Sequence, residues 1–435
     1  MFLEILFITI TIAWIIFGTA FLKWHPIIVL LTGSLLLGIS LQIGLIDVLF
    51  QMFEGFINLT KNIGVLILFG VIIGLNLERN GATSVISLGI LKTFSKLPLT
   101  YIISLIGFIV SIPVFCDAAF IILSTLNKKL SELTKTSKKT LTIALSTGLF
   151  APHVLVPPTP GPLAAASALN LDNIFLLFIC GGGLALFLAL VGAFYSHNFI
   201  KKSSVISKAT IQSLINNSKL DDDLTFRLAS APIWLPILLM SIRPLVPANI
   251  IYLTTPVFSL FIGVFVSLYI SFRKVKIQPL LIKSLKHSIP IIAITGAGGA
   301  LGKIIQNIDV ISWFDDVSYF DSLGIIIPFL IAATLKTAQG SSTVAMITAA
   351  SIIYPILFIF GLENDTGKIF TILAIGVGSM TVSHANDSYF WIVSQMSGLD
   401  IKTAYQTHTI ATFIQGVSGI IFLLITYNLY KLFLN

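Results

Sequence analysis

Long apolar runs follow one another along almost the whole chain, and most are long enough to cross a lipid bilayer as a helix. The chain is 56% hydrophobic and only 10% charged, a balance that soluble domains do not have. A helix needs about 20 apolar residues to span the hydrocarbon core, so the sequence predicts an all-α polytopic membrane protein with about ten transmembrane helices. The runs lie near 2–22, 26–44, 62–78, 141–170, 173–196, 229–247, 251–270, 289–304, 369–397 and 406–430.

Two stretches interrupt this pattern with Pro, Gly, His, Asn and Asp, and the second follows the first at a distance of 226 residues. The first, 111–162, contains SIPVFCD and APHVLVPPTPGP. The second, 337–388, contains TAQGSST and MTVSHANDS. Broken membrane segments at corresponding positions in two halves of a chain indicate the binding site of a transporter.

Two further apolar runs, 99–126 and 322–361, are interrupted in the middle, and we expect each to form a re-entrant hairpin. Non-helical backbone is tolerated at membrane depth where it lines a cavity or is buried in protein. Positive charge supports this topology. With the N-terminus outside and both hairpins returning to the side they left, most of the 26 Lys and Arg fall in inside loops.

This topology gives each half five spans and one hairpin, and because five is odd we expect two inverted-topology repeats. The expected division is a first repeat over 1–200, a cytoplasmic linker over 201–228 and a second repeat over 229–435. A duplication with parallel halves is the alternative. Interfacial helices are expected before the hairpins, over 81–97 and 308–320.

The first hairpin carries Pro113 and Asp117 in an otherwise apolar run. A carboxylate at membrane depth is costly and by default indicates function. We expect Asp117 to bind a proton or a cation. The alternative is that Asp117 caps the helix over 118–126.

The second hairpin carries the sequence KTAQGSST at its centre. Glycine permits a tight turn there, and the free N–H groups of the helix that follows attract an anion. Lys336 adds a full positive charge, unless its side chain extends to the membrane interface instead. The predicted substrate-binding residues are Lys336, Thr337, Gln339, Gly340, Ser341, Ser342 and Thr343.

Four prolines between 157 and 162 exclude a continuous helix in the first broken span. The unwound backbone must be satisfied by ligand, water or neighbouring side chains. Thr159 and Gly161 are the predicted substrate contacts. His153 is a candidate proton carrier, although a hydrogen-bonded structural histidine is the simpler interpretation.

The second broken span contains SHANDS over 383–388. We expect Asn386 to contact substrate, and Asp387 or His384 to take part in proton or cation coupling. Burial favours the protonated form of Asp387 unless a cation lies close. His384 and Asp387 lack a third ligand, so no metal site is expected.

No Walker motif, nucleophile–base pair or metal set is present in the sequence, so we expect neither an ATP-driven pump nor an enzyme, and no cofactor. The net charge of +8 reflects loop cations and does not predict a nucleic-acid partner. Uphill transport by such a chain would use an ion gradient.

The interrupted segments resemble the gluconate permease family of proton symporters, one of the ion transporters with two hairpins and inverted repeats. The resemblance implies proton-coupled uptake of gluconate, a related sugar acid or a small hydroxy acid across the bacterial plasma membrane, by a homodimer. Lys336 stands where Arg is usual in that family, which replaces a bidentate contact by a point charge. The matching segments are EGF (54–56), FGVIIGLNLERNGA (69–82), PVFCDAAF (113–120), PHVLVPPTPGPLAA (152–165), KTAQGSSTVAM (336–346) and SHANDSYFW (383–391).

Several alternatives stay open from the sequence. The coupling ion could be sodium, since unwound carbonyls bind sodium as readily as a carboxylate binds a proton. The substrate could be glycerate or D-serine. A passive organic-anion channel or a non-transporting sensor with the same fold is the alternative from another functional class.

Overall fold

The computed structural model describes residues 2–201, 203, 205–217, 224–242, 246–271, 275–308 and 324–434. These residues form helices and their connections, and no strand occurs among them, which confirms the predicted all-helical class. The first half contains α1 (Phe2–Ala20), α2 (Pro26–Ser40), α3 (Leu45–Arg79), α4 (Ala82–Thr93), α5 (Leu99–Ser111), α6 (Cys116–Thr134), α7 (Lys138–Leu155), α8 (Pro160–Ala168), α9 (Ile174–Tyr195), the π-helix η1 (Ser196–Ile200) and α10 (Lys208–Asn217).

The second half is helical as well. It contains α11 (Phe226–Ser241), η3 (Ala248–Thr254), α12 (Pro256–Ser271), α13 (Ile277–Ile305), α14 (Ile326–Gln339), α15 (Ser342–Ile353), η6 (Tyr354–Phe360), α16 (Asp365–Met380), α17 (Ser388–Ser397), α18 (Ile401–Ala404), the π-helix η7 (Tyr405–Thr409) and α19 (Ile410–Leu434).

Several helices are long and apolar enough to cross a membrane. Within the described residues, five helices meet this requirement. The number rises to six if the two segments of α3, which are bent by 42°, count as one span. Shorter apolar helices accompany them, so a polytopic membrane protein fits the structure, while the number of ten spans stays a prediction. The long helices are Lys138–Ala168, Ile174–Ile200, Ile277–Ile305, Ser342–Phe360 and Ile401–Leu432.

Both interrupted apolar runs form helical hairpins. Helices α5 and α6 meet at residues 112–115, which we call tip 1. Helices α14 and α15 meet at Gly340 and Ser341, and we call residues 336–343 around this turn tip 2. The hairpin helix α6 extends to Thr134, beyond the predicted end at residue 126.

Both predicted breaks also interrupt helices. Residues 156–159, called break 1, separate α7 from α8, and residues 381–387, called break 2, separate α16 from α17. Helix α6 begins at Cys116 and α15 begins at Ser342, which preserves the spacing of 226 residues. The inverted orientation of the two halves stays a prediction.

The predicted interfacial helix over 81–97 corresponds to α4. Its counterpart over 308–320 lies outside the described residues, except for Ile308. The segment predicted as a linker, 201–228, holds α10 and the start of α11, and its residues 218–223 also lie outside the described part. The division into two repeats and a linker stays a prediction.

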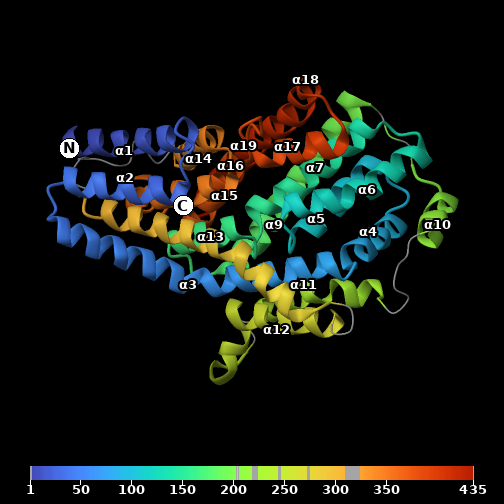
Figure 1. Cartoon of the computed structure of the whole chain (residues 1–435), viewed down its shortest axis with the longest axis horizontal. Coiled ribbons are helices and arrows are strands. Elements are labelled where there is room, and N and C mark those ends of the chain that lie inside the picture. Colours follow the sequence, from blue (N-terminus) through green and yellow to red (C-terminus); the bar gives the residue numbers. More distant parts are fainter. Residues whose placement is uncertain are drawn as a thin grey trace.

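Helices α2, α3 and α13 run side by side along the long axis of the molecule (Figure 1). Their contact is close because Gly55 of α3 and Gly299 of α13 face each other, and a Cβ on either glycine would meet the backbone of the other helix. Small residues allow such close approach of membrane helices.

The hairpins pack on the broken spans of both halves. Helix α5 packs on α7, and α14 packs on α16, each within its own half. The second helix of each hairpin crosses to the other half, so that α6 packs on α17 and α15 packs on α8. This exchange brings the two hairpins and the two broken spans together in the interior.

Candidate functional site

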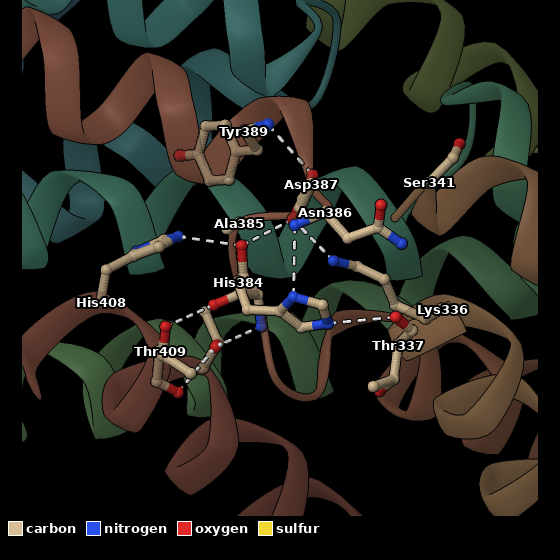
Figure 2. A network of polar contacts seen from close by, with 12 residues as sticks. Lys336, Thr337, Ser341, His384, Ala385, Asn386, Asp387, Tyr389, His408 and Thr409 are labelled. Atoms are coloured by element: carbon tan, nitrogen blue, oxygen red, sulfur yellow. Dashed lines mark hydrogen bonds and ion pairs between the residues drawn. The ribbon is translucent and has the colours of Figure 1, made fainter. Parts of the chain in front are cut away.

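A buried ion pair joins tip 2 to break 2. Lys336 Nζ, in the last turn of α14, lies 2.6 Å from Asp387 Oδ2, and the two side chains are only 1% and 6% exposed (Figure 2). The Phe150 ring lies beneath the ammonium group, with its centroid 5.8 Å from Nζ. Charges at this depth are tolerated when they are paired and hydrogen-bonded. Lys336 therefore does not extend to the membrane interface.

Asp387 has two further partners. Ser383 Oγ donates to the same oxygen, Oδ2, at 2.6 Å. The backbone N–H of Tyr389 donates to Oδ1 at 3.0 Å, which makes Asp387 the N-cap of α17. An acidic N-cap satisfies an otherwise unpaired helix N–H and interacts favourably with the helix dipole. The carboxylate is thus held between an ammonium group, a hydroxyl and a helix N-terminus.

Break 2 also binds the last carbonyls of α14, which have no partner within their own helix. His384 Nε2 donates to Thr337 O at 3.0 Å, and Asn386 Nδ2 donates to Ala338 O. Because His384 Nδ1 accepts the N–H of Asn386 at 3.2 Å, its Nε2 must carry the ring proton. His384 therefore joins break 2 to α14 through Nε2 and holds the backbone within break 2 through Nδ1.

The unwound backbone of break 2 is satisfied by side chains of η7 and α19. Thr412 Oγ1 accepts from Ser383 N at 3.0 Å, and Thr409 Oγ1 donates to Ser383 O at 2.6 Å. Tyr405 OH accepts from Ala385 N at 3.3 Å. These bonds meet the requirement that irregular backbone in a membrane be paired with neighbouring protein groups.

The same part of the chain contributes a buried histidine that the sequence analysis missed. His408, on η7, is 0% exposed, and its Nε2 lies 3.2 Å from Ser383 Oγ. Its Nδ1 lies 3.2 Å from Ser146 Oγ on α7. The signal was present as the polar cluster QTHT within an apolar run, because ionisable residues inside spans indicate function.

Asp117 lies in the first turn of α6, two residues beyond tip 1 in the hairpin. It accepts a weak hydrogen bond from Cys116 Sγ at 3.6 Å, and it forms no ion pair with any other residue that the structure describes. It interacts electrostatically with both Asp387 and Lys336. The N-cap of α6 is Phe115, so the capping alternative for Asp117 does not match the geometry.

The residues predicted in and beside break 1 lie apart from the hydrogen bonds around Lys336. Thr159 Oγ1 donates to Val156 O at 2.5 Å, so its hydroxyl hydrogen is used within break 1. Gly161 faces the Met346 side chain of α15, where a Cβ would be 2.7 Å from the sulfur. His153 is buried, with its ring centroid 6.2 Å from that of Phe115, and its Nδ1 has no hydrogen-bond partner in the described chain.

The polar residues of tip 2 include groups with unused hydrogen-bonding capacity. Both amide atoms of Gln339 are inaccessible and have no partner among the described residues. Ser341 Oγ accepts from Val344 N at 3.4 Å and caps α15. Ser342 is buried, whereas Thr337 is exposed and Thr343 half-buried. Substrate contact by these residues stays a prediction, as does contact by Thr159, Gly161 and Asn386.

Tip 1 and break 1 lie against a glycine face of α3. A Cβ on Gly74 would clash with Pro113 O, and a Cβ on Gly70 would lie 3.1 Å from Pro158 O. We expect Gly74→Ala to lower the stability of the protein by about 1–3 kcal/mol, since it forces backbone apart. Gly64→Ala on the same helix is the control, because its Cβ would be 3.7 Å from the nearest atom. Equal thermal unfolding of the two purified variants would contradict this packing.

Comparison with known proteins decides the family. The model of the GntP family permeases matches residues 3–429. The chain belongs to this family. The gluconate permease of Pseudomonas aeruginosa is 27% identical over 425 residues, covering 93% of each chain. The D-serine transporter DsdX of Escherichia coli K12 is 27% identical over 427 residues, covering 94% of each chain.

A solved structure shares the fold. The MtrF protein of Neisseria gonorrhoeae, described as illuminating a class of antimetabolite efflux pumps, superposes with a TM-score of 0.66 at 14% identity, covering 88% of this chain and 84% of that one. This member of the GntP permease family is thus a transporter with a multi-pass membrane architecture, and its family and relatives are permeases rather than enzymes. The predicted family is confirmed.

Proposed function

We propose that this GntP permease is a secondary active transporter that carries gluconate, or a related sugar acid or small hydroxy acid, into the cell together with protons. The observation that carries the proposal is the buried Lys336–Asp387 pair between tip 2 and break 2. Lys336 supplies a cation for the substrate carboxylate, and Asp387 neutralises that cation when substrate is absent.

Charge balance then explains the coupling. A substrate carboxylate that pairs with Lys336 displaces Asp387, whose side chain is 6% exposed. Leaving a buried charge without its partner costs about 3–5 kcal/mol. Uptake of one proton near Asp387 removes that cost, because the site regains zero net charge. Anion and proton therefore stabilise each other's binding, which is the linkage that symport requires.

The hydroxyl groups of a sugar acid would be bound by the polar residues of tip 2. The amide of Gln339 has unused donors and acceptors in the described structure, and Ser341, Ser342 and Thr343 begin α15 close to Lys336 in sequence. A site built to hydrogen-bond hydroxyls rejects analogues that lack them, because its polar groups are then left unpaired.

The wider proposal includes two inverted repeats in a homodimer in the bacterial plasma membrane. The equal spacing of tips and breaks in the two halves supports the repeats. Transport then proceeds by movement of the part that bears the hairpins relative to the rest of the molecule. The bacterial relatives named gluconate permease and D-serine transporter support the location.

A second substrate class has a specific observation in its favour. Asp117 is a carboxylate without an ion-pair partner in the described residues, and it interacts electrostatically with Lys336 and Asp387. A zwitterionic amino acid such as D-serine could place its carboxylate on Lys336 and its ammonium group near Asp117. One relative is a D-serine transporter.

Uptake by purified protein in proteoliposomes tests the proposal. We expect labelled gluconate, glycerate or D-serine to accumulate when the outside is acidic, and accumulation to stop when a protonophore collapses the gradient. The control uses an inward sodium gradient at equal pH. Uptake that ignores the protonophore but follows sodium would overturn proton coupling. Flux without saturation or counterflow would identify a channel instead.

A further inference from the structure

We propose that the coupling proton resides on His408, and that Asp387 stays ionised and exchanges Lys336 for the His408 imidazolium. This inference rests on the proposed symport and adds the proton-binding residue, which is neither of the carboxylates expected from the sequence. The structural basis is a continuous hydrogen-bonded path from Asp387 through Ser383 to His408 and Ser146.

The path has a defined direction at its first steps. Ser383 Oγ donates its only hydrogen to Asp387 Oδ2 at 2.6 Å. Toward His408, Ser383 Oγ can therefore only accept a hydrogen bond. His408 Nε2, at 3.2 Å, must therefore carry a hydrogen. Figure 2 shows His408 and Lys336 on opposite sides of Asp387. The carboxylate thus has one cationic partner in contact and a second candidate one hydroxyl away.

The other ring nitrogen can exist in both protonation states. Ser146 Oγ lies 3.2 Å from His408 Nδ1 and 3.1 Å from Ile143 O. When Nδ1 is protonated, it donates to Ser146, which donates to Ile143 O. When Nδ1 is bare, the Ser146 hydroxyl turns to donate to it, and Ile143 O still accepts from Thr147 Oγ1 at 2.7 Å. Gain of a proton needs only the rotation of one hydroxyl.

The charges around His408 connect its protonation to substrate. The titratable groups that act on it are Asp387, of opposite charge to the imidazolium, and Lys336, of the same charge. The Tyr389 ring of α17 lies 5.6 Å from the imidazole, and α7 contributes the neutral Ser146. At 0% exposure an imidazolium is costly unless a carboxylate neutralises it. Asp387 can neutralise the imidazolium only when Lys336 is no longer paired with it.

Two neutral states follow from this arrangement. Without substrate, Lys336 pairs with Asp387 and His408 is uncharged. With substrate, the substrate carboxylate pairs with Lys336, and Asp387 pairs through Ser383 with protonated His408. Each state has zero net charge in the interior, whereas anion alone or proton alone leaves an unpaired charge. The carrier therefore reorients only when empty or when loaded with both.

His408→Gln tests the assignment in proteoliposomes. We expect proton-driven accumulation and substrate counterflow both to fall on the order of tenfold or more, the size of a typical coupling between sites. The reason is that substrate without the proton leaves an unpaired buried charge, and the loaded carrier then does not reorient. His197→Gln is the matched control. His197 also lies on a π-helix, η1, and bonds to the hydroxyl of Ser203 at 3.1 Å. That hydroxyl bonds in turn to Thr100 and, in the described chain, to no carboxylate, whereas the Ser383 hydroxyl beside His408 bonds to Asp387. We expect accumulation by this variant to match the wild type.

Wild-type accumulation and pH dependence in His408→Gln would overturn the assignment and leave symport itself intact. Absence of proton-driven uptake in the wild type would instead overturn the proposed function. A misfolded His408→Gln protein would also lose transport, so Ser146→Ala is the second test. Ser146→Ala removes the hydroxyl that accepts from protonated Nδ1, which destabilises the protonated His408 ring more than the neutral ring. A lower pH is then needed to protonate His408, so the pH of half-maximal uptake should fall by about one unit. An unchanged pH profile in Ser146→Ala would overturn the assignment.

Discussion

Lys336→Met is expected to reduce uptake by about two orders of magnitude, since it removes the charge-assisted partner of the substrate carboxylate. It is also expected to destabilise the protein by about 3–5 kcal/mol, because Asp387 is left as an uncompensated buried charge. Asp387 Oδ2 would keep only Ser383 as a partner. Labelled uptake in proteoliposomes and thermal unfolding in detergent measure the two effects separately.

The pair is best separated by a double-mutant cycle. Asp387→Asn leaves Lys336 unpaired, whereas the double variant Lys336→Met with Asp387→Asn removes both charges and should recover most of the lost stability. It should not recover uptake, because no cation remains for the anion. Lys336→Arg is the matched control, since it keeps the charge. Normal uptake by Lys336→Met or by Asp387→Asn would remove that residue from the transport mechanism.

The order of elements was predictable because helix breakers and apolar runs act locally. Pro113 and Gly340 lie at or beside the two tips, and the prolines of 157–162 separate α7 from α8. Exact lengths were less predictable. Helix α6 continues to Thr134 through polar sequence, because amphipathic helices extend beyond the apolar segment that hydropathy detects. The helix α10 inside the expected linker has the same cause.

The site was predicted as separate residues rather than as a network. Lys336 and Asp387 were each selected for charge at membrane depth, but their pairing joins segments 51 residues apart and depends on tertiary packing. His384 was a candidate for ion coupling, whereas its ring joins Thr337 O to Asn386 N. His408 was missed because its run was interpreted as an ordinary span. Its role depends on Ser383, 25 residues away.

Gly340→Ala should abolish uptake, although the substitution adds one methyl group. Gly340 ends α14 in the left-handed region at φ +76, and a Cβ there would clash with Asn386 O of break 2. The left-handed conformation alone costs a non-glycine residue about 1–2 kcal/mol. The clash adds to it, because backbone of break 2 must move and the bonds of His384 and Asn386 to α14 must lengthen.

Comparison with Gly81→Ala isolates the cost of the clash from the cost of the left-handed conformation. Gly81 precedes α4 at φ +80, and a Cβ on it would meet nothing within 4 Å. Both variants carry the same conformational cost, so their difference in unfolding temperature reports the contact between tip 2 and break 2. Gly81→Ala should retain uptake with a small loss of stability. If both variants transported equally well, the close contact of Gly340 with Asn386 would not be needed for transport, and the Lys336–Asp387 pair would have to form without it. A loss confined to Gly340→Ala would show that the carrier needs tip 2 and break 2 to be held together where the ion pair forms.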